Sequence, residues 1–228
     1  MSSSLRQIRF LLFKAVPKMT SMKGADMRSS SYRKAIIKMK VMVRASMVLL
    51  GFVSVVLIIS LPARSSTNIP TTATFVYVTD FLSGRVLMEK QKDAPMKPAS
   101  MAKIMTAYIV FDRIAEGSLA LTDQFTVSEK AWKMGGSRSF LQAGRSYSLD
   151  ELLHGVIVQS GNDAAVVIAE GISGTEDNFA AEMNTTAAKL GMTNTTFTNS
   201  TGWPDPNLTT TAHDLALLST AIIKKFPA

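Results

Sequence analysis

The chain contains no cysteine and only two histidines, His154 and His213. The missing thiols exclude disulfides, thiolate catalysis and zinc sites built on cysteine. Because the two histidines lie far apart and in no His-x-x-x-His spacing, we expect no metal site and no metal cofactor. Many exported proteins lack disulfides, so the absence of cysteine does not fix the compartment.

Acidic residues are almost absent from the start of the chain. Residues 1–44 hold 11 of the 25 Lys and Arg residues and the single acid Asp26, whereas residues 45–228 hold 14 basic and 16 acidic residues. The net charge of +8 therefore arises from the N-terminal segment, and the remainder is nearly neutral. This distribution gives no indication of a nucleic-acid partner. The length of 228 residues and an apolar content of 46% suit one substantial core.

Residues 45–61 form an uncharged apolar stretch that follows Arg44 and precedes Pro62-Ala63-Arg64. A comfortable membrane span needs about 20 apolar residues, so this stretch suits the core of a signal peptide or a marginal membrane anchor. A buried core helix is a poor alternative because the stretch has no polar face and follows a basic cluster. We therefore expect an exported protein that meets the membrane through residues 45–61.

Residues 1–44 make an unusually long basic leader for such a segment. Half of the 14 methionines lie within residues 1–47, and the six residues from Met39, Met-Lys-Val-Met-Val-Arg, have the composition of an ordinary signal-peptide start. We expect translation to begin near Met39. Residues 64–73, rich in Ser, Thr and Pro, have the composition of a polar linker.

Beyond the linker, the pattern predicts two strands followed mostly by helices. Residues 74–80 and 85–89 read as a hairpin around Ser83-Gly84. Apolar periodicity and end signals predict helices over 98–116, 149–158, 162–171, 175–190 and 212–225, with residues 117–148 mixed. No internal repeat or low-complexity tract is present. The expected fold class is α+β.

Ser100 and Lys103 lie three residues apart on the expected first turn of the helix that follows Pro98. Residues at this spacing share a helix face, and the small Ala107 one turn further leaves room for a ligand. Serine needs a base to become a good nucleophile, and lysine can be that base when burial or a helix N-terminus disfavours its charged form. Alone the pattern is weak, because the chain repeats it at Ser31 and Lys34.

A second candidate is the polar corner Ser160-Gly161-Asn162 between two apolar helices. It carries a hydroxyl and an amide that could serve a ligand. The alternative is structural: Asn162 is a natural cap for the next helix, and Ser-Gly is ordinary turn chemistry.

Together the two stretches are far more specific. A Ser-x-x-Lys at a helix start, followed 60 residues later by Ser-x-Asn, resembles the order of motifs in the penicillin-recognising serine acyl-transfer enzymes. The flanking residues are similar to the serine-type D-alanyl-D-alanine carboxypeptidases, low-molecular-mass penicillin-binding proteins. This likeness covers roughly residues 74–228 and includes Pro98–Thr106, Gln159–Ala164, Phe179–Asn184, Leu190–Met192 and Thr211–Ala216.

The resemblance implies an antiparallel sheet packed on a helical cluster, as in β-lactamases and transpeptidases. It implies a hydrolase in which Ser100 forms the acyl-enzyme, Lys103 is the general base, Ser160 relays a proton and Asn162 binds substrate. The implied partners are peptidoglycan stem peptides ending in D-Ala-D-Ala and inhibitory β-lactams. The implied compartment is the bacterial periplasm or the outer face of the cytoplasmic membrane.

One part of the family pattern is missing, because the sequence contains no Lys-Thr-Gly or Lys-Ser-Gly. In the family this motif lies on a strand that binds the substrate carboxylate and helps form the oxyanion hole. Losing one oxyanion donor typically lowers the rate by about 10²–10³. We therefore expect residues 74–228 to be a truncated catalytic domain without its C-terminal strands. The alternative is an impaired or inactive fragment that binds peptidoglycan or penicillin at most. A β-lactamase is disfavoured since no Glu-x-x-x-Asn follows Ser160.

Overall fold

The computed structural model describes residues 34, 37–38, 40–43 and 70–227. The chain separates into two compact units, Met1–Arg64 and Ser65–Ala228. The expected start at Met39 and the apolar stretch 45–61 lie outside the described residues, as does most of the linker. Among the residues that are described, no helix is long and apolar enough to cross a bilayer.

The second unit contains short antiparallel strand pairs and a group of helices, the α+β class expected from the sequence. In chain order the elements are β1 (Val76–Thr79), β2 (Val86–Lys90), the 3₁₀ helix η2 (Ala99–Ala102), α3 (Lys103–Ala115), β3 (Gln124–Thr126), α4 (Glu129–Trp132), β4 (Ser146–Ser148), α5 (Leu149–Gln159), α6 (Asn162–Ser173), α7 (Glu176–Lys189) and α8 (Ala212–Lys225).

The predicted hairpin is present as β1 and β2. The strands pair antiparallel with Val76 opposite Lys90, and the register shifts between Val78 and Thr79. The Asp80 carbonyl accepts the Gly84 backbone N–H, and Gly84 adopts a φ of 70°, which explains the glycine in this turn. Helix α8 packs on β1, so one face of the hairpin is covered by a helix.

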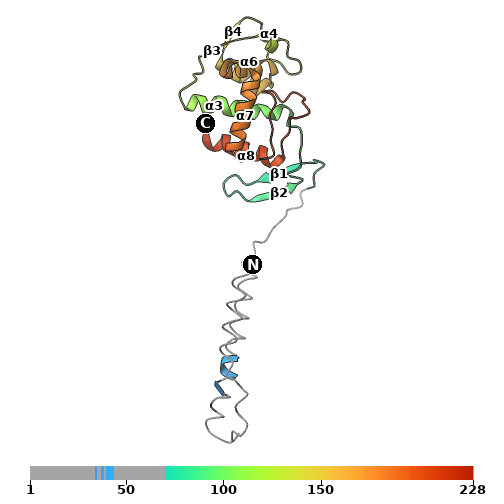
Figure 1. Cartoon of the computed structure of the whole chain (residues 1–228), viewed down its shortest axis with the longest axis vertical. Coiled ribbons are helices and arrows are strands. Elements are labelled where there is room, and N and C mark those ends of the chain that lie inside the picture. The colour runs from blue at the N-terminus through green and yellow to red at the C-terminus, as the bar shows by residue number, and fades with distance from the viewer. Residues whose placement is uncertain (1–33, 35–36, 39, 44–69, 228) are drawn as a thin grey trace. The chain divides into compact units, whose positions relative to one another are not determined.

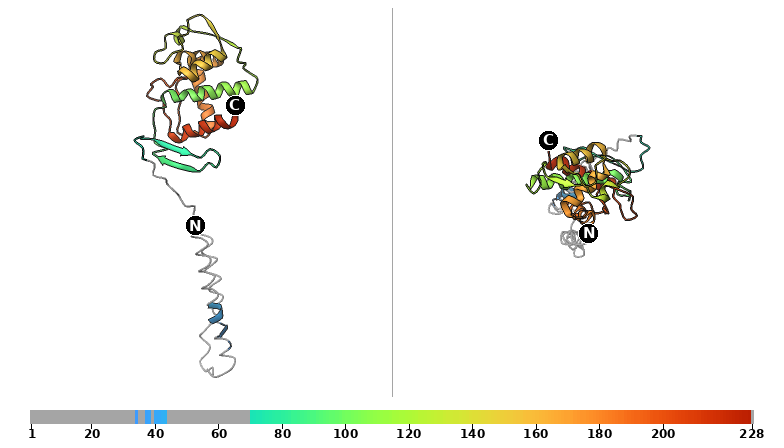
Figure 2. Two further views of the ribbon diagram at one scale, coloured as in Figure 1. Left: turned by 180° about the vertical axis from the view of Figure 1, so that it is seen from behind. Right: turned by 90° about the horizontal axis from the view of Figure 1, so that it is seen from above.

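Helix α3 lies at the centre of this unit and contributes to both of its apolar cores. Figure 1 shows α3 between α6 on one side and α8 with the hairpin on the other, and the reverse view in Figure 2 agrees. Val110 of α3 belongs to a core formed mainly with α5 and α6, and Met105 belongs to a core formed mainly with α7 and α8. Helix α3 is therefore held from two directions.

The predicted caps of α7 and α8 are confirmed. Thr175 caps α7 by accepting the Asn178 N–H, and Thr211 caps α8 by accepting the Asp214 N–H. The Asp214 carboxylate does not complete a reciprocal box, because it accepts the Asn194 N–H and the Thr195 hydroxyl instead. The cap thereby also ties α8 to the loop that precedes it.

The mixed region 117–148 contains three short elements that the sequence did not reveal. Strands β3 and β4 pair antiparallel, and α4 lies between them in the chain. Each strand has only three residues, too few for an alternating pattern to be read. The Phe125 ring packs closely against Gly171 of α6, which leaves no space there for a Cβ atom. This fit joins the β3–β4 pair to the helical core.

Candidate active site

The segment from Pro98 to Lys103 carries the candidate nucleophile, and it differs from the continuous helix expected from the sequence. Ala99–Ala102 form a 3₁₀ helix and the α-helix begins only at Lys103. Ala99 adopts a φ of 47°, a left-handed conformation that is strained for a residue with a Cβ. Ser100 consequently sits on a tight exposed turn directly before the buried start of α3.

Lys103 and Ser100 face each other as the spacing predicts. Lys103 Nζ lies 3.3 Å from Ser100 Oγ. The same nitrogen donates to Asn162 Oδ1 at 2.7 Å and to the Thr201 carbonyl at 2.9 Å. Three segments that are distant in the sequence therefore meet at one amine.

The Lys103 side chain is buried, with only 5% of the residue exposed. Burial disfavours the ammonium form and lowers the pKa of Lys103 from 10.5 to about 8. A neutral amine has two N–H donors and one lone pair. With Asn162 and Thr201 taking the two donors, the lone pair is left for the Ser100 hydroxyl, which is the arrangement that general-base activation needs.

This lowered pKa predicts how stability changes with pH. Between about pH 8 and 10.5 the unfolded chain holds a proton on Lys103 that the folded chain has lost, so the free energy of unfolding rises with pH in that window. Urea titrations should show an increase of up to about 3 kcal/mol in the parent relative to Lys103→Met. An identical pH dependence in the two proteins would contradict the buried-amine assignment.

The Ser160–Asn162 corner lies between α5 and α6 as predicted, but Asn162 is not the helix cap. Gly161 occupies the cap position and Asn162 is the first residue of α6. Its side chain accepts from Lys103 through Oδ1 and donates through Nδ2 to the Gly135 carbonyl at 2.7 Å. Asn162 thus connects the amine to a third part of the chain, and the capping interpretation is wrong.

Ser160 ends α5 in a left-handed conformation with a φ of 54°. Serine adopts this region at a cost of about 1 kcal/mol, and such strain gathers at functional sites. Within residues 70–227, Ser160 bonds through its backbone N–H to the Gly155 carbonyl, and its Oγ has no hydrogen-bond partner. Its hydroxyl remains available to a ligand.

The loop from Gly135 to Leu141 lies against this corner and was not singled out in the sequence. The Asn162 N–H donates to the Ser137 carbonyl, and the buried Asp163 carboxylate accepts the N–H groups of Ser139 and Leu141. These bonds fix Gly135, whose carbonyl orients the Asn162 amide. The Gly135-Gly136 pair was the sequence feature that could have indicated this close contact, because Cβ atoms added there would press on Trp203 and Asn162.

The second missed segment is Asn199–Trp203. The Asn199 side-chain oxygen accepts the N–H groups of Thr201, Gly202 and Trp203, which folds this segment into a compact turn. Ser200 is fixed by hydrogen bonds to its backbone N–H, its hydroxyl and its carbonyl. The buried Glu176 accepts its N–H and hydroxyl, and Thr106 donates to its carbonyl.

Gly202 brings this turn into direct contact with the nucleophile segment. A Cβ atom at Gly202 would lie 1.7 Å from the Ala99 carbonyl oxygen, and Gly202 has a φ of 81°. Only glycine fits both conditions. The Thr201 carbonyl that receives Lys103 is therefore positioned by close packing of the next residue on the turn that carries Ser100.

The two histidines form separate contacts. His213 Nδ1 lies 3.1 Å from Asp93 Oδ1, and His154 Nδ1 lies 2.9 Å from the Asp150 carbonyl oxygen. As the sequence indicated, His213 and Asp214 belong to the first turn of α8. No group of three His, Cys, Asp or Glu side chains in the described ranges is arranged to hold a metal ion.

Comparison with known proteins shows the family to which this chain belongs. The family model for D-alanyl-D-alanine carboxypeptidase, peptidase family S11, matches residues 63–228. The chain belongs to the D-alanyl-D-alanine carboxypeptidase family. Within this family, it is 42% identical over 154 residues to the carboxypeptidase DacC of Escherichia coli K12, a match covering 65% of this chain and 38% of that protein. DacF of Bacillus subtilis is 39% identical over 142 residues, which cover 62% of this chain and 36% of DacF.

Solved structures of family members have the same fold. DacD of Francisella tularensis superposes with a TM-score of 0.69 at 42% identity, over 70% of this chain and 39% of DacD. Penicillin-binding protein 5 of Haemophilus influenzae gives a TM-score of 0.66 at 37% identity, over 70% of this chain and 48% of that protein. This carboxypeptidase-family chain thus has the penicillin-binding protein fold and spans less than half the length of these relatives.

Proposed function

We propose that the chain carries the acylation centre of a serine D-alanyl-D-alanine carboxypeptidase, with Ser100 as the nucleophile. The observation that carries the proposal is the buried Lys103 amine, 3.3 Å from Ser100 Oγ, with two other acceptors for its N–H groups. This arrangement supports a base that is uncharged at the pH of the reaction. Membership of the family supports the substrate class.

In the proposed reaction, Ser100 Oγ attacks the carbonyl carbon of the penultimate D-alanine while its proton passes to Lys103. The bond from that carbon to the nitrogen of the last D-alanine then breaks, while Ser160 gives its proton to the leaving amine and takes up the proton held by Lys103. D-alanine departs and an ester remains on Ser100. Water then attacks the ester carbonyl carbon and gives a proton to Lys103. The bond to Ser100 Oγ breaks, Ser100 takes that proton, and the shortened peptide leaves.

Two further groups support these roles. Asn162 touches Lys103 through its amide oxygen and is fixed by Gly135, so it can orient the amine and reach a substrate amide. Ser160 lies two residues before Asn162 and keeps its hydroxyl unbonded among residues 70–227. A strained, unpartnered hydroxyl at the corner of two helices suits a proton relay.

The proposed substrate is a peptidoglycan stem peptide ending in D-Ala-D-Ala, and β-lactams are the proposed covalent inhibitors. Relatives named as carboxypeptidases and as penicillin-binding proteins support both. We further propose residues 74–228 as the catalytic portion, residues 64–73 as its linker, and export to the wall-facing side of the membrane through residues 45–61. The uncharged stretch after a basic leader supports this location.

The test is covalent labelling of the full chain with a fluorescent penicillin, together with release of D-alanine from an N-acylated peptide ending in D-Ala-D-Ala. Long incubations are needed, because the sequence has no Lys-Thr-Gly and a missing oxyanion donor slows acylation by about 10²–10³. We expect mass mapping to locate the adduct on Ser100, and Ser100→Ala to remain unlabelled.

Two outcomes would oppose the proposal. Labelling of Ser100→Ala equal to that of the parent would exclude Ser100 as the nucleophile. Reversible binding of penicillin without any adduct would favour the binding-module alternative. A matched peptide ending in L-Ala-L-Ala should release no alanine.

A further inference from the structure

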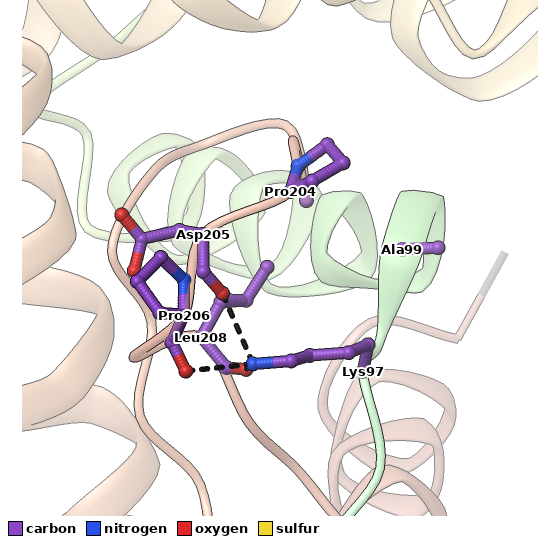
Figure 3. A pocket seen from close by; sticks show the side chains of 7 residues that line it. Lys97, Ala99, Pro204, Asp205, Pro206 and Leu208 are labelled. Carbon is purple, nitrogen blue, oxygen red and sulfur yellow. Dashed lines mark hydrogen bonds between the residues drawn. The ribbon is translucent and has the colours of Figure 1, made fainter.

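The turn that holds Lys103 continues into a limb, residues 203–208, of which only Leu208 at the far end is buried. An open cavity of about 380 Å³ separates this limb from the nucleophile segment, with a largely apolar lining (Figure 3). Its walls are Lys97, Ala99, Gly202, Pro204, Asp205, Pro206 and Leu208. Apolar packing therefore fixes the far end of the limb at Leu208, whereas Pro204, Asp205 and Pro206 line the open cavity.

A single side chain spans this cavity. Lys97 Nζ donates to the backbone carbonyls of Asp205 at 3.0 Å, Pro206 at 2.8 Å and Leu208 at 2.7 Å, and Figure 3 shows the extended side chain reaching the limb. Three carbonyls of one turn thus converge on one ammonium group and use all three of its donors. An ordinary surface lysine pairs with one mobile carboxylate, a contact of little energetic consequence.

The position of Lys97 in the chain makes this contact relevant to the site. Lys97 is followed by the buried Pro98 and the strained Ala99, and Ser100 comes next. Its neighbour Met96 pairs with Thr210 through two backbone hydrogen bonds just beyond the limb. The segment that carries the nucleophile is therefore bonded to both the limb and its exit.

We propose that Lys97 is a positioning residue, whose ammonium group locks the 203–208 limb onto the nucleophile segment and so holds the Thr201 carbonyl against Lys103. The inference rests on the proposed function for its catalytic consequence. With the lock in place, Gly202 stays against Ala99 and Thr201 keeps one donor of the amine occupied. Without it, the limb moves into the cavity or away from it, and the lone pair of Lys103 loses its fixed direction toward Ser100.

The first test compares Lys97→Ala, Lys97→Arg and the control Lys92→Met, which loses an ion pair with Glu89 and a cation–π contact with Tyr77, both away from the limb. We expect Lys97→Ala to lower the rate of Ser100 labelling by about 10- to 100-fold, because a misplacement of about 1 Å can cost about 10²-fold in rate. Lys97→Arg should recover most of the rate, and Lys92→Met should match the parent. Equal labelling rates in Lys97→Ala and the parent would overturn the inference.

Chemical rescue separates a lock from a general loss of stability. Propylammonium replaces the part of the lysine side chain that Lys97→Ala removes, and it can donate to the same three carbonyls. We expect it to restore labelling at least severalfold. Tetramethylammonium has the same charge but no N–H donor, so it should not. Equal effects of the two cations would contradict the carbonyl lock.

A readout independent of acylation keeps this inference distinct from the proposed function. Trp203 lies on the limb and is 45% exposed, and Trp132 is the other tryptophan of the chain. In a Trp132→Phe background, acrylamide quenching of Trp203 should increase in Lys97→Ala and decrease again with propylammonium. If the parent is never labelled, the proposed function fails. The quenching of Trp203 then still tests whether Lys97 holds the limb in place. Unchanged quenching in Lys97→Ala would overturn the lock.

Discussion

Acylation of Ser100 is expected to accelerate about tenfold with each pH unit from pH 5 to 7 and to level off above about pH 8. Only the uncharged amine of Lys103 can accept the Ser100 proton, and burial lowers the pKa of this amine to about 8. At pH 7 about one molecule in ten then has the neutral base. With the ordinary pKa of 10.5, the fraction would be about one in 3,000.

The sign of this profile follows from the direction of the pKa change. Raising the pH removes the proton from Lys103 and increases the reactive fraction, so the rate rises with pH and approaches a plateau once the amine is neutral. The measurement is the second-order rate of labelling by a fluorescent penicillin at constant ionic strength. A midpoint near 10.5 would show that the amine is not buried in the reacting protein.

Lys103→Met is the matched control for this experiment, since methionine keeps most of the length and apolar surface without a titrating amine. Loss of a general base typically lowers a rate by about 10²–10⁴. We therefore expect Lys103→Met to label slowly and with no rise between pH 5 and 8. A rise equal to that of the parent would assign the titration to another group.

The side-chain half of the candidate site was predictable from the sequence, and the backbone half was not. A serine and a lysine at helical spacing, and an asparagine at a helix corner, carry chemistry that can be recognised in the residues themselves. The Thr201 and Gly135 carbonyls belong to groups that every residue has, so residue type does not reveal their role, and the Gly135-Gly136 pair indicates only a close approach of the backbone. Their role depends on packing between segments that lie far apart in the chain.

The same distinction applies to the fold. Long amphipathic helices such as α7 and α8 reveal themselves through periodicity and capping residues, and their predicted limits agree with the structure to within a residue or so. Strands β3 and β4 form only through pairing with each other and packing on α6. Strained residues were also invisible, because Ala99 and Ser160 adopt left-handed conformations that their identities disfavour.

The structure holds those two strained residues in place by different means. Ser160 ends α5 where its successor Gly161 lies close to the Gly155 carbonyl, to which it donates. The carbonyl group of Ala99 packs directly against Gly202. Left-handed conformations of such residues cost about 1 kcal/mol each, so surrounding contacts must enforce them. This requirement makes the glycine at position 202 a sensitive point of the site.

Gly202→Ala is expected to destabilise the protein by about 2–4 kcal/mol and to abolish measurable labelling of Ser100. Its Cβ would overlap the Ala99 carbonyl oxygen, and the φ of 81° is unfavourable for alanine as well. Overpacking costs about 1–3 kcal/mol, and a left-handed alanine adds about 1 kcal/mol. Urea unfolding gives the first quantity and penicillin labelling the second.

Gly191→Ala separates these two contributions. Gly191 follows α7 with a φ of 79°, and a Cβ there would meet no atom within 4 Å. This control should lose only about 1 kcal/mol and label at the parent rate. The difference between the two alanine variants then measures the close approach of Gly202 to Ala99. Equal losses of stability, with labelling retained in Gly202→Ala, would mean that the turn bearing Thr201 does not have to touch the nucleophile segment for Ser100 to react.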